Sequence, residues 1–283
     1  MKVLVTGATG FIGNYVVEEL LKNNFDIIAT SILPEKAIHF SWLKEVNYVQ
    51  ADLNISREDW FSFFGKPDLL IHLAWEGLPN YKESFHLERN LPSNRIFLKS
   101  MIEGGLKRVV VIGTCLEYGM QNGALREDLE TKPDNSYALA KDNLRKFLEK
   151  LQETIVFDLK WIRLFYIYGR GQRPDSLLSQ LDAALERKEK VFNMSGGEQL
   201  RDYLPIEKVA EYIVRISTQD KVSGIINCCS GKPISIRELV ENYLAERNKS
   251  IELKLGYYPY PDYEPMAFWG CDQKLQNALN GGA

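Results

Sequence analysis

A glycine-rich turn near the start of the chain constrains the fold more than any other feature. The segment Thr6–Gly13, Thr-Gly-Ala-Thr-Gly-Phe-Ile-Gly, follows a short apolar run directly and leads into the helical pattern Asn14–Lys22. Gly7 permits a tight turn, Gly10 lets the backbone approach a pyrophosphate, and Gly13 lets the helix pack closely on the strand. In this strand–turn–helix context the spacing favours a dinucleotide site over a purely structural turn.

Short apolar runs alternate with helical patterns through the first two-thirds of the chain. Several are continuous rather than alternating, as expected for parallel strands that are buried on both faces. We therefore predict an α/β Rossmann fold, a doubly wound parallel sheet with right-handed crossovers. The expected strands are Val3–Val5, Asp26–Ala29, Asn47–Gln50, Leu69–Leu73, Arg108–Ile112, Trp161–Ile167 and Gly224–Cys228.

The pattern changes after Tyr168, which predicts a second, smaller unit. We expect a dinucleotide-binding domain over 1–168, with a returning strand and helix near 204–230, and a mainly substrate-binding lobe over 169–283. Helices are expected over Ser176–Lys188, over Pro205–Ser217 and from Ser235, where Glu238 completes a capping-box pattern. The segment Tyr257–Pro265 is too rich in Pro and Tyr for a regular helix.

Composition narrows the class of protein further. The 283 residues carry a net charge of −3 with scattered basic residues, which argues against nucleic acid or an anionic membrane as a partner. No apolar run approaches the roughly 18 residues that span a bilayer. Because the chain starts directly with a strand, we expect no signal peptide and a cytoplasmic protein. Four cysteines without a CxxC pair and three histidines predict no metal site, and Cys228 and Cys229 are expected to be core residues.

A second motif predicts acid–base chemistry. Tyr137 and Lys141 lie four residues apart, so a helix places them one turn apart on the same face. A nearby ammonium is expected to lower the pKa of the phenol, which then serves as a proton donor or acceptor. The buried run Arg108–Ile112 brings Thr114 to the carboxyl end of a strand, where α/β sheets bind ligands. We predict Thr114, Tyr137 and Lys141 as the catalytic residues.

The end of the second strand bears on the choice of cofactor. An NAD site there usually has an Asp or Glu that holds the ribose hydroxyls. This chain reads Ala29-Thr30-Ser31, with no carboxylate before Glu35. Hydroxyl groups and a cation such as Lys36 suit a 2′-phosphate instead, so the sequence favours NADP(H) over NAD.

Together these motifs resemble the extended short-chain dehydrogenase/reductase family, the NAD(P)-dependent epimerases and dehydratases. Arg163–Gly169 resembles the strand that closes the family's active site, and Arg201–Tyr203 resembles the motif whose Arg binds a substrate diphosphate. The segments Gly113–Gly119 and Glu264–Trp269 resemble the bacterial nucleotide-sugar 4-ketoreductases that make deoxysugars for surface glycans. The resemblance implies a homodimer formed through helices near Leu87–Ile102 and Tyr137–Gln152, although their apolar faces serve equally well as monomer core. Tyr166 stands where the family usually has Asn.

The resemblance and the motifs together define the expected site. Cofactor contacts are expected from Gly7, Thr9, Gly10, Phe11, Ile12, Gly13, Thr30, Ser31, Lys36, Asp52, Leu53, Leu73, Ala74, Tyr137 and Lys141. Substrate contacts are expected from Cys115, Glu117, Tyr166 and Arg201. Alternatives are a helix cap for Asp52, a salt bridge with Asp202 or another acid for Arg201, and a satisfied core residue for His72.

The same segments indicate the class of reaction. Family dehydratases carry an Asp-Glu pair directly after the catalytic Thr, and here those positions hold Cys115 and Leu116, which argues against dehydration. We expect NADPH-dependent reduction of the C4 ketone of a nucleotide-linked 4-keto-6-deoxyhexose, dTDP-linked before CDP- or GDP-linked. The alternatives are a 4-epimerase with tightly bound NAD, a non-catalytic NADP-binding sensor or scaffold, and a reductase of small carbonyls. A diphosphate-binding Arg201 argues against the last.

Overall fold

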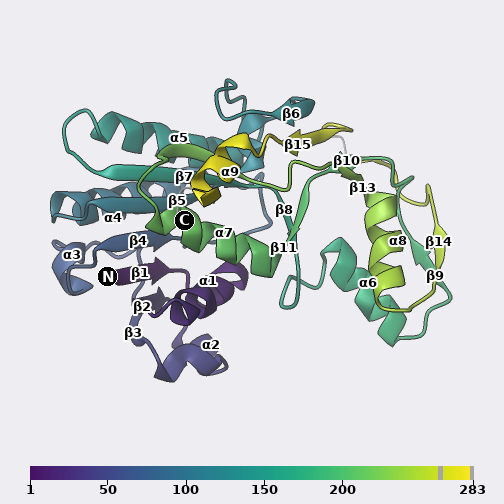
Figure 1. The fold of residues 1–283 in the computed structure, drawn as a ribbon, viewed down its shortest axis with the longest axis horizontal. Coiled ribbons are helices and arrows are strands. Elements are labelled where there is room, and N and C mark those ends of the chain that lie inside the picture. Colours follow the sequence, from purple (N-terminus) through teal and green to yellow (C-terminus); the bar gives the residue numbers. More distant parts are fainter. Residues whose placement is uncertain (261–263, 281–283) are drawn as a thin grey trace.

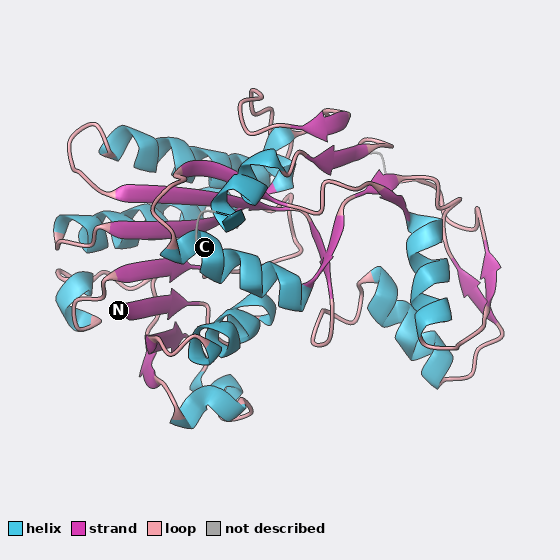
Figure 2. Cartoon of the chain, viewed as in Figure 1, coloured by secondary structure: helices cyan, strands magenta, loops and turns pink. Residues whose placement is uncertain are grey.

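The centre of the molecule is a seven-stranded parallel sheet (Figures 1 and 2). The computed structural model describes residues 1–260 and 264–280. Each neighbouring pair of strands in this sheet runs parallel. In spatial order the strands are β12 (Gly224–Cys228), β7 (Asp158–Leu164), β5 (Arg108–Thr114), β4 (Leu69–His72), β1 (Lys2–Thr6), β2 (Asp26–Ser31) and β3 (Asn47–Gln50).

This order confirms the predicted doubly wound Rossmann fold. The chain runs outward from β1 through β2 to β3, and then returns to place β4 on the other side of β1. Ligands of open α/β sheets bind beyond the carboxyl ends of the strands at such a reversal. The turn after β1 and the end of β4 therefore face the expected site.

Helices cover both faces of the sheet. On one face α1 (Phe11–Lys22), α7 (Ile206–Thr218) and α9 (Gln273–Asn280) bury an apolar cluster that includes Val3, Val5 and Ile226. On the other face α3 (Trp60–Phe63), α4 (Leu91–Glu103) and α5 (Ser136–Leu151) bury a second cluster around Trp60 and Trp161. The returning segment expected near 204–230 thus supplies α7 and the edge strand β12.

The sixth predicted strand differs from expectation. The run Trp161–Ile167 is not one strand, because β7 ends at Leu164 and β8 (Tyr166–Tyr168) begins after Phe165. β8 pairs with β11 (Tyr203–Pro205) outside the central sheet. The apolar run continues through both strands, so hydrophobicity alone does not mark the residue at which the chain leaves the sheet.

A lobe built on two helices and the paired strands β9 (Val191–Asn193) and β14 (Glu252–Lys254) lies beyond the carboxyl ends of the strands, at the right of Figure 1. Its core packs Leu181, Phe192 and Val240 between α6 (Leu177–Glu186) and α8 (Ile236–Glu246). The Ser235 side chain accepts a hydrogen bond from the Glu238 amide, which confirms the predicted start of α8. The other small strands are β6 (Gly123–Leu125), β10 (Leu200–Arg201), β13 (Ile234–Ser235) and β15 (Phe268–Gly270).

Short helical turns complete the chain at α2 (Pro34–Ala37), η1 (Ser41–Lys44), η2 (His86–Asn90) and η3 (Cys115–Tyr118). The described part of the Pro- and Tyr-rich segment is not helical, and its residues 261–263 lie outside the described residues. Within 1–260 and 264–280, no helix combines the length and the apolar character needed to cross a bilayer.

Candidate active site

The glycine turn leaves no space for side chains at two positions. Gly7 has φ +68°, and a Cβ there would lie 2.9 Å from the Ala74 nitrogen at the end of β4. A Cβ on Gly13 would lie 2.1 Å from the Gly7 carbonyl oxygen. The turn therefore packs directly against α1 and against the β4 end, as predicted.

Gly10 begins α1 and leaves the helix N-terminus open. A Cβ on Gly10 would meet only the Gly7 oxygen, at 3.1 Å, so the protein itself does not fill this side of the turn. Among the described residues no side chain caps α1, and its first turn contains no acid. The amide groups and the positive end of the helix dipole suit an anion. The residues present therefore fit the diphosphate of a nicotinamide dinucleotide, with half-buried Thr9, Phe11 and Ile12 beside it.

A buried histidine, His72, is hydrogen-bonded to Thr6 at the start of the glycine turn. Thr6 Oγ1 accepts the amide protons of Leu73 and Ala74, so it donates its own proton to His72 Nδ1 at 2.8 Å. His72 Nε2 then donates to Asn94 Oδ1 at 2.6 Å. Burial lowers the pKa of His72 to about 3, which keeps the ring neutral. The interpretation of His72 as a satisfied core residue is confirmed.

Thr114 and Tyr137 meet at the carboxyl end of β5. Thr114 ends the strand, and Asn135 caps α5 by accepting the Ala138 amide at 2.9 Å, which sets the start of the helix that carries Tyr137. Burial raises the pKa of Tyr137 well above its usual value, and a hydrogen bond with the Thr114 side chain opposes this. The expected lowering of the Tyr137 pKa is wrong, because desolvation of the phenol dominates. The proton therefore stays on the phenol at neutral pH.

Lys141 lies one turn along α5 and is 2 % exposed. Its Nζ donates to the Ile112 carbonyl at 2.9 Å and lies 4.0 Å from the centroid of the Trp75 ring. Burial lowers the pKa of Lys141 to about 7, against the attraction of the Glu117 carboxylate, which raises it. The structure thus brings the three predicted catalytic residues to one place.

Glu117 is fully buried behind this centre. Its carboxylate accepts the Thr114 amide at 2.9 Å, the Trp161 indole N–H at 3.0 Å and Arg163 Nε at 2.8 Å. Gly113 is required here, since a Cβ would lie 2.2 Å from the Trp161 nitrogen and 2.5 Å from the carboxylate. The predicted substrate contact of Glu117 is not what the structure shows, because the carboxylate is enclosed and bonded to the protein. Its role is to hold the end of β5.

The other predicted substrate residues form a polar cluster with Glu264. Arg201 is 2 % exposed and donates to the Leu200 and Met266 carbonyl oxygens. Its other terminal nitrogen binds Glu264 at 3.1 Å, and the Tyr166 hydroxyl donates to the same carboxylate. Of the salt-bridge partners considered for Arg201, the structure selects Glu264.

Two neighbours complete the surroundings of this cluster. Asp202 accepts the amide protons of Ser230, Gly231 and Gly270, so it connects the loop that follows β12 with the end of β15. Cys115 is buried beside Tyr166 in a small apolar cluster, and burial raises the pKa of its thiol. A thiol in this state is not an acid at neutral pH, in keeping with the argument against dehydration.

The residues expected near the adenosine ribose differ in accessibility. Thr30 Oγ1 is buried, with no hydrogen-bond partner among the described residues, so it is not presented to a cofactor. Ser31 Oγ is hydrogen-bonded to the Tyr48 hydroxyl at 2.8 Å, and Lys36 is exposed on α2. Asp52 accepts the Asn54 amide at 2.9 Å and so caps a turn rather than a helix. Leu53, Leu73 and Ala74 are half-buried at the ends of their strands.

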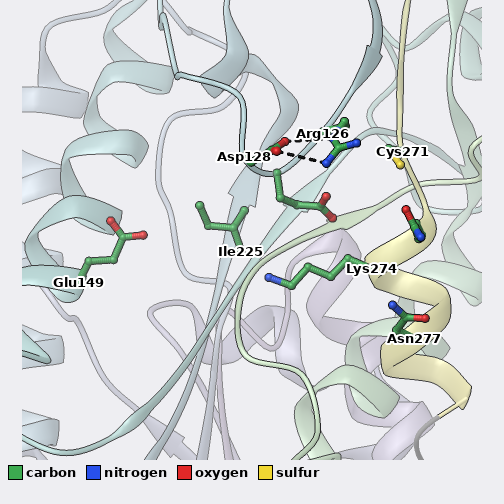
Figure 3. A pocket seen from close by; sticks show the side chains of 9 residues that line it. Arg126, Asp128, Glu149, Ile225, Cys271, Lys274 and Asn277 are labelled. Atoms are coloured by element: carbon green, nitrogen blue, oxygen red, sulfur yellow. Dashed lines mark hydrogen bonds and ion pairs between the residues drawn. The ribbon is translucent and has the colours of Figure 1, made fainter.

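Two cavities lie away from the catalytic residues. One of about 500 Å³ opens at the β12 edge of the sheet (Figure 3), and another of about 340 Å³ lies between β8, β11 and the start of α8. The first is lined by Arg126, Glu127, Asp128, Glu149, Ile225, Cys271, Gln273, Lys274 and Asn277, and the second by Tyr168, Tyr203, Ser230, Lys232, Pro233, Ile234, Glu238 and Leu239. Neither lining includes a predicted site residue.

Comparison with known proteins agrees with this geometry. The family described as NAD dependent epimerase/dehydratase family matches residues 3–229. The chain belongs to this family. The extended short-chain dehydrogenase/reductase fold and a nicotinamide dinucleotide cofactor follow from that membership and from the fit of the glycine turn.

Individual relatives come from several branches of the family. A dTDP-6-deoxy-L-talose 4-dehydrogenase (NAD(+)) of Aggregatibacter actinomycetemcomitans is 34% identical over 96% of this chain and 100% of its own length. A dTDP-4-dehydro-6-deoxyglucose reductase of Escherichia coli is 24% identical over 87% of this chain and 82% of its own. The solved structure of MoeE5 with UDP-glucuronic acid and NAD is 25% identical, covers 100% of this chain and 94% of its own, and superposes with a TM-score of 0.83.

Three residues of this family member's site were missed from the sequence: Trp75, His86 and Glu264. Trp75 directly follows the half-buried pair Leu73-Ala74 at the end of β4, which was a usable signal. His86 carries no local pattern and reaches the site only through the fold. Glu264 begins the segment Glu264–Trp269, which resembles the 4-ketoreductases, but nothing near it in the sequence indicates its contact with Arg201.

Proposed function

We propose that this protein reduces the C4 ketone of a nucleotide-linked 4-keto-6-deoxyhexose with NADPH. The observation that carries the proposal is that the Thr114 side chain lies close enough to the Tyr137 phenol to lower its pKa at the carboxyl end of β5, with Lys141 buried one turn along α5. Cys115 and Leu116 follow Thr114 where a dehydratase would need two acids. The set can move one proton to or from a substrate oxygen, which is what ketone reduction requires.

The roles follow from the contacts. When bound, the nicotinamide supplies a hydride to the ketone carbon. Tyr137 donates its phenolic proton to the ketone oxygen, and the Thr114 hydroxyl holds that oxygen beside the phenol. Lys141 binds the nicotinamide ribose and stabilises the phenolate that remains. Holding both reactants against fixed donors supplies much of the acceleration.

The relatives support a nucleotide sugar as the substrate. One is named as a 4-dehydrogenase of a dTDP-6-deoxytalose and another as a reductase of a dTDP-4-dehydro-6-deoxyglucose. Oxidation of a C4 hydroxyl and reduction of a C4 ketone are the two directions of one reaction. We therefore propose a dTDP-linked substrate before CDP- or GDP-linked ones, with Arg201 as the group that binds its diphosphate.

NADP(H) is our proposed cofactor, on the ground that residues 29–31 at the end of β2 include no carboxylate to repel a 2′-phosphate. With Thr30 buried, Ser31 and Lys36 are the groups left to bind it. The MoeE5 complex contains NAD, and the 34% identical relative is named for NAD(+). The ratio of kcat/KM for NADPH and NADH decides between them. Ser31→Asp is the matched variant, because a carboxylate there selects against NADPH.

Three other functions lead to different observations. A 4-epimerase among the relatives, the UDP-glucose 4-epimerase of Halalkalibacterium halodurans, is 26% identical over 99% of this chain. An epimerase changes the sugar without net loss of reduced cofactor, and a sensor or scaffold changes neither. A reductase of small carbonyls would turn over ketones that carry no diphosphate.

We also propose a cytoplasmic homodimer that pairs α4 and α5 with their copies. Most of the apolar side chains of both helices pack inside the subunit, but Ile96 is 54 % exposed and Leu139 is 38 % exposed on the outer faces. Light scattering of the wild type and of Ile96→Glu tests this. A monomeric wild type would contradict it.

The deciding experiment offers NADPH and NADH separately with dTDP-, CDP- and GDP-linked 4-keto-6-deoxyhexoses, and follows absorbance and sugar NMR together. Stoichiometric oxidation with one sugar supports the proposal. A changed sugar without oxidation indicates an epimerase. No change in either would overturn the proposal.

A further inference from the structure

Trp75 places an aromatic ring over the predicted catalytic pair. The residue lies three positions after the end of β4 and is half-buried. Its ring centroid lies 4.0 Å from Lys141 Nζ and 5.9 Å from the Tyr137 ring, which it meets edge-on at 70°. One side chain thus contacts both Lys141 and Tyr137, the two residues that take part in the proposed proton transfer.

The orientation of this indole is fixed by a buried histidine. The Trp75 indole N–H donates to His86 Nδ1 at 3.0 Å. Since Nδ1 accepts, the ring proton is on Nε2, which donates to the Asn80 carbonyl at 3.0 Å. His86 is fully buried, and burial lowers its pKa, so the ring stays neutral. The indole is held by this chain of bonds and cannot rotate freely.

We propose that Trp75 is a positioning residue whose indole face stabilises the ammonium form of Lys141 and fixes the direction of that amine. The proposal rests on the proposed function only in giving Lys141 a catalytic role. The contact between the ring and the amine is independent of the substrate.

The need for such support follows from the surroundings of Lys141. The amine is buried, which favours its neutral form, and it donates a hydrogen bond to the Ile112 carbonyl oxygen. Among the described residues, three ionisable groups act on it: Glu117 from η3, His72 from β4 and His86 from η2. The Glu117 carboxylate favours the ammonium, while both histidines are kept neutral and so do not repel it. The negative face of an indole adds attraction that an aliphatic side chain lacks.

The test compares Trp75→Leu with Trp75→Phe. Both variants lose the N–H bond to His86, but only Leu removes the aromatic face from the amine. Protein labelled with ¹³C-lysine is titrated by NMR without substrate or cofactor, and the Lys141 signal is identified by its absence in Lys141→Met. We expect the Lys141 pKa to fall by roughly 0.5–1 unit in Trp75→Leu. In Trp75→Phe it should fall by less than half as much.

The activity arm uses the pH profile of ketone reduction. Because reduction uses the ammonium form, kcat/KM should fall as the pH rises and Lys141 loses its proton. In Trp75→Leu this fall should begin at a lower pH than in the wild type, by the same shift as the Lys141 pKa. A residue that only fills space would lower the rate at every pH and leave the profile in place. If Trp75→Leu does not fold, Trp75→Met, which also lacks a ring, replaces it.

The outcomes separate the two proposals. An unchanged Lys141 pKa in the leucine variant, or equal shifts in the leucine and phenylalanine variants, overturns the role of Trp75 even if the enzyme is a reductase. A shifted pKa in a protein that reduces no sugar ketone keeps the role of the indole and rejects the proposed function.

Discussion

The two sides of the site differ in how their functional groups are engaged. On the sheet side, the Tyr137 phenol and the Thr114 hydroxyl lie beside each other at the end of β5. On the lobe side, the Arg201 guanidinium donates to two backbone carbonyls and to Glu264, which also binds Tyr166. The first region is arranged for chemistry before a substrate arrives. In the proposed function the second would exchange a protein carboxylate for a substrate phosphate, so binding there would compete with the Arg201–Glu264 ion pair.

The largest effect should come from the sheet side. Tyr137→Phe removes the proton donor and leaves the ring in place, so kcat should fall by about 100- to 10,000-fold. NADPH binding, measured by calorimetry, should be unchanged, because the glycine turn is untouched. Wild-type turnover in this variant would remove Tyr137 from the mechanism.

Glu117→Gln tests how the sheet side is supported. Glu117 and Arg163 are both fully buried, so neutralising the carboxylate leaves the guanidinium without its counter-charge. Urea titration should show a loss of about 3 kcal/mol in the free energy of unfolding. Glu130→Gln, an exposed acid in a surface pair, is the matched control and should change little. Equal losses in the two variants would contradict a supporting role for Glu117.

Arg201→Lys tests the lobe side. Lysine keeps the charge but lacks the planar fork that binds a phosphate through two hydrogen bonds. KM for the nucleotide sugar should rise about tenfold with kcat little changed, since the residue contacts no reacting atom in the proposed mechanism. A fall in kcat at constant KM would show that Arg201 acts in the chemical step and not in substrate binding.

Glu264→Gln should give the smallest change of the four variants, and whether it strengthens or weakens the binding of dTDP is informative. If Glu264 competes with the substrate diphosphate for Arg201, removing its charge should tighten binding of dTDP about threefold, measured by calorimetry. Binding of thymidine, which has no phosphate, should not change. Weaker binding of dTDP would show that Glu264 contacts the ligand instead of competing with it.

Sequence reasoning succeeded where one short segment carries the whole geometry. The spacing of Gly7, Gly10 and Gly13 reports a turn between one strand and the next helix, and Tyr137 and Lys141 report one helical turn. Such features depend on neighbours within a few residues. The parallel sheet was predictable for the same reason, from continuous apolar runs.

It failed where the partner comes from far along the chain. Arg201 meets Glu264 across 63 positions, and Arg163 meets Glu117 across 46. Glu117 lies three residues after Thr114, so position suggested a substrate contact, but Trp161 and Arg163 on the next strand enclose it. Lys141 was expected to lower the Tyr137 pKa, yet the extent of burial, which decides the direction, is a property of the packed fold.

The late return of the chain to the sheet has a consequence for synthesis. β12 pairs with β7, but roughly 60 residues, which include part of the lobe and α7, separate the two in the sequence. At about 5–20 residues per second a ribosome needs roughly 3–12 seconds to deliver them, during which β7 has an unpaired backbone edge and the α1 face lacks α7. The nascent protein passes through this interval with its nucleotide-binding turn already made and its last strand still missing. A chaperone that acts on this chain would meet it there.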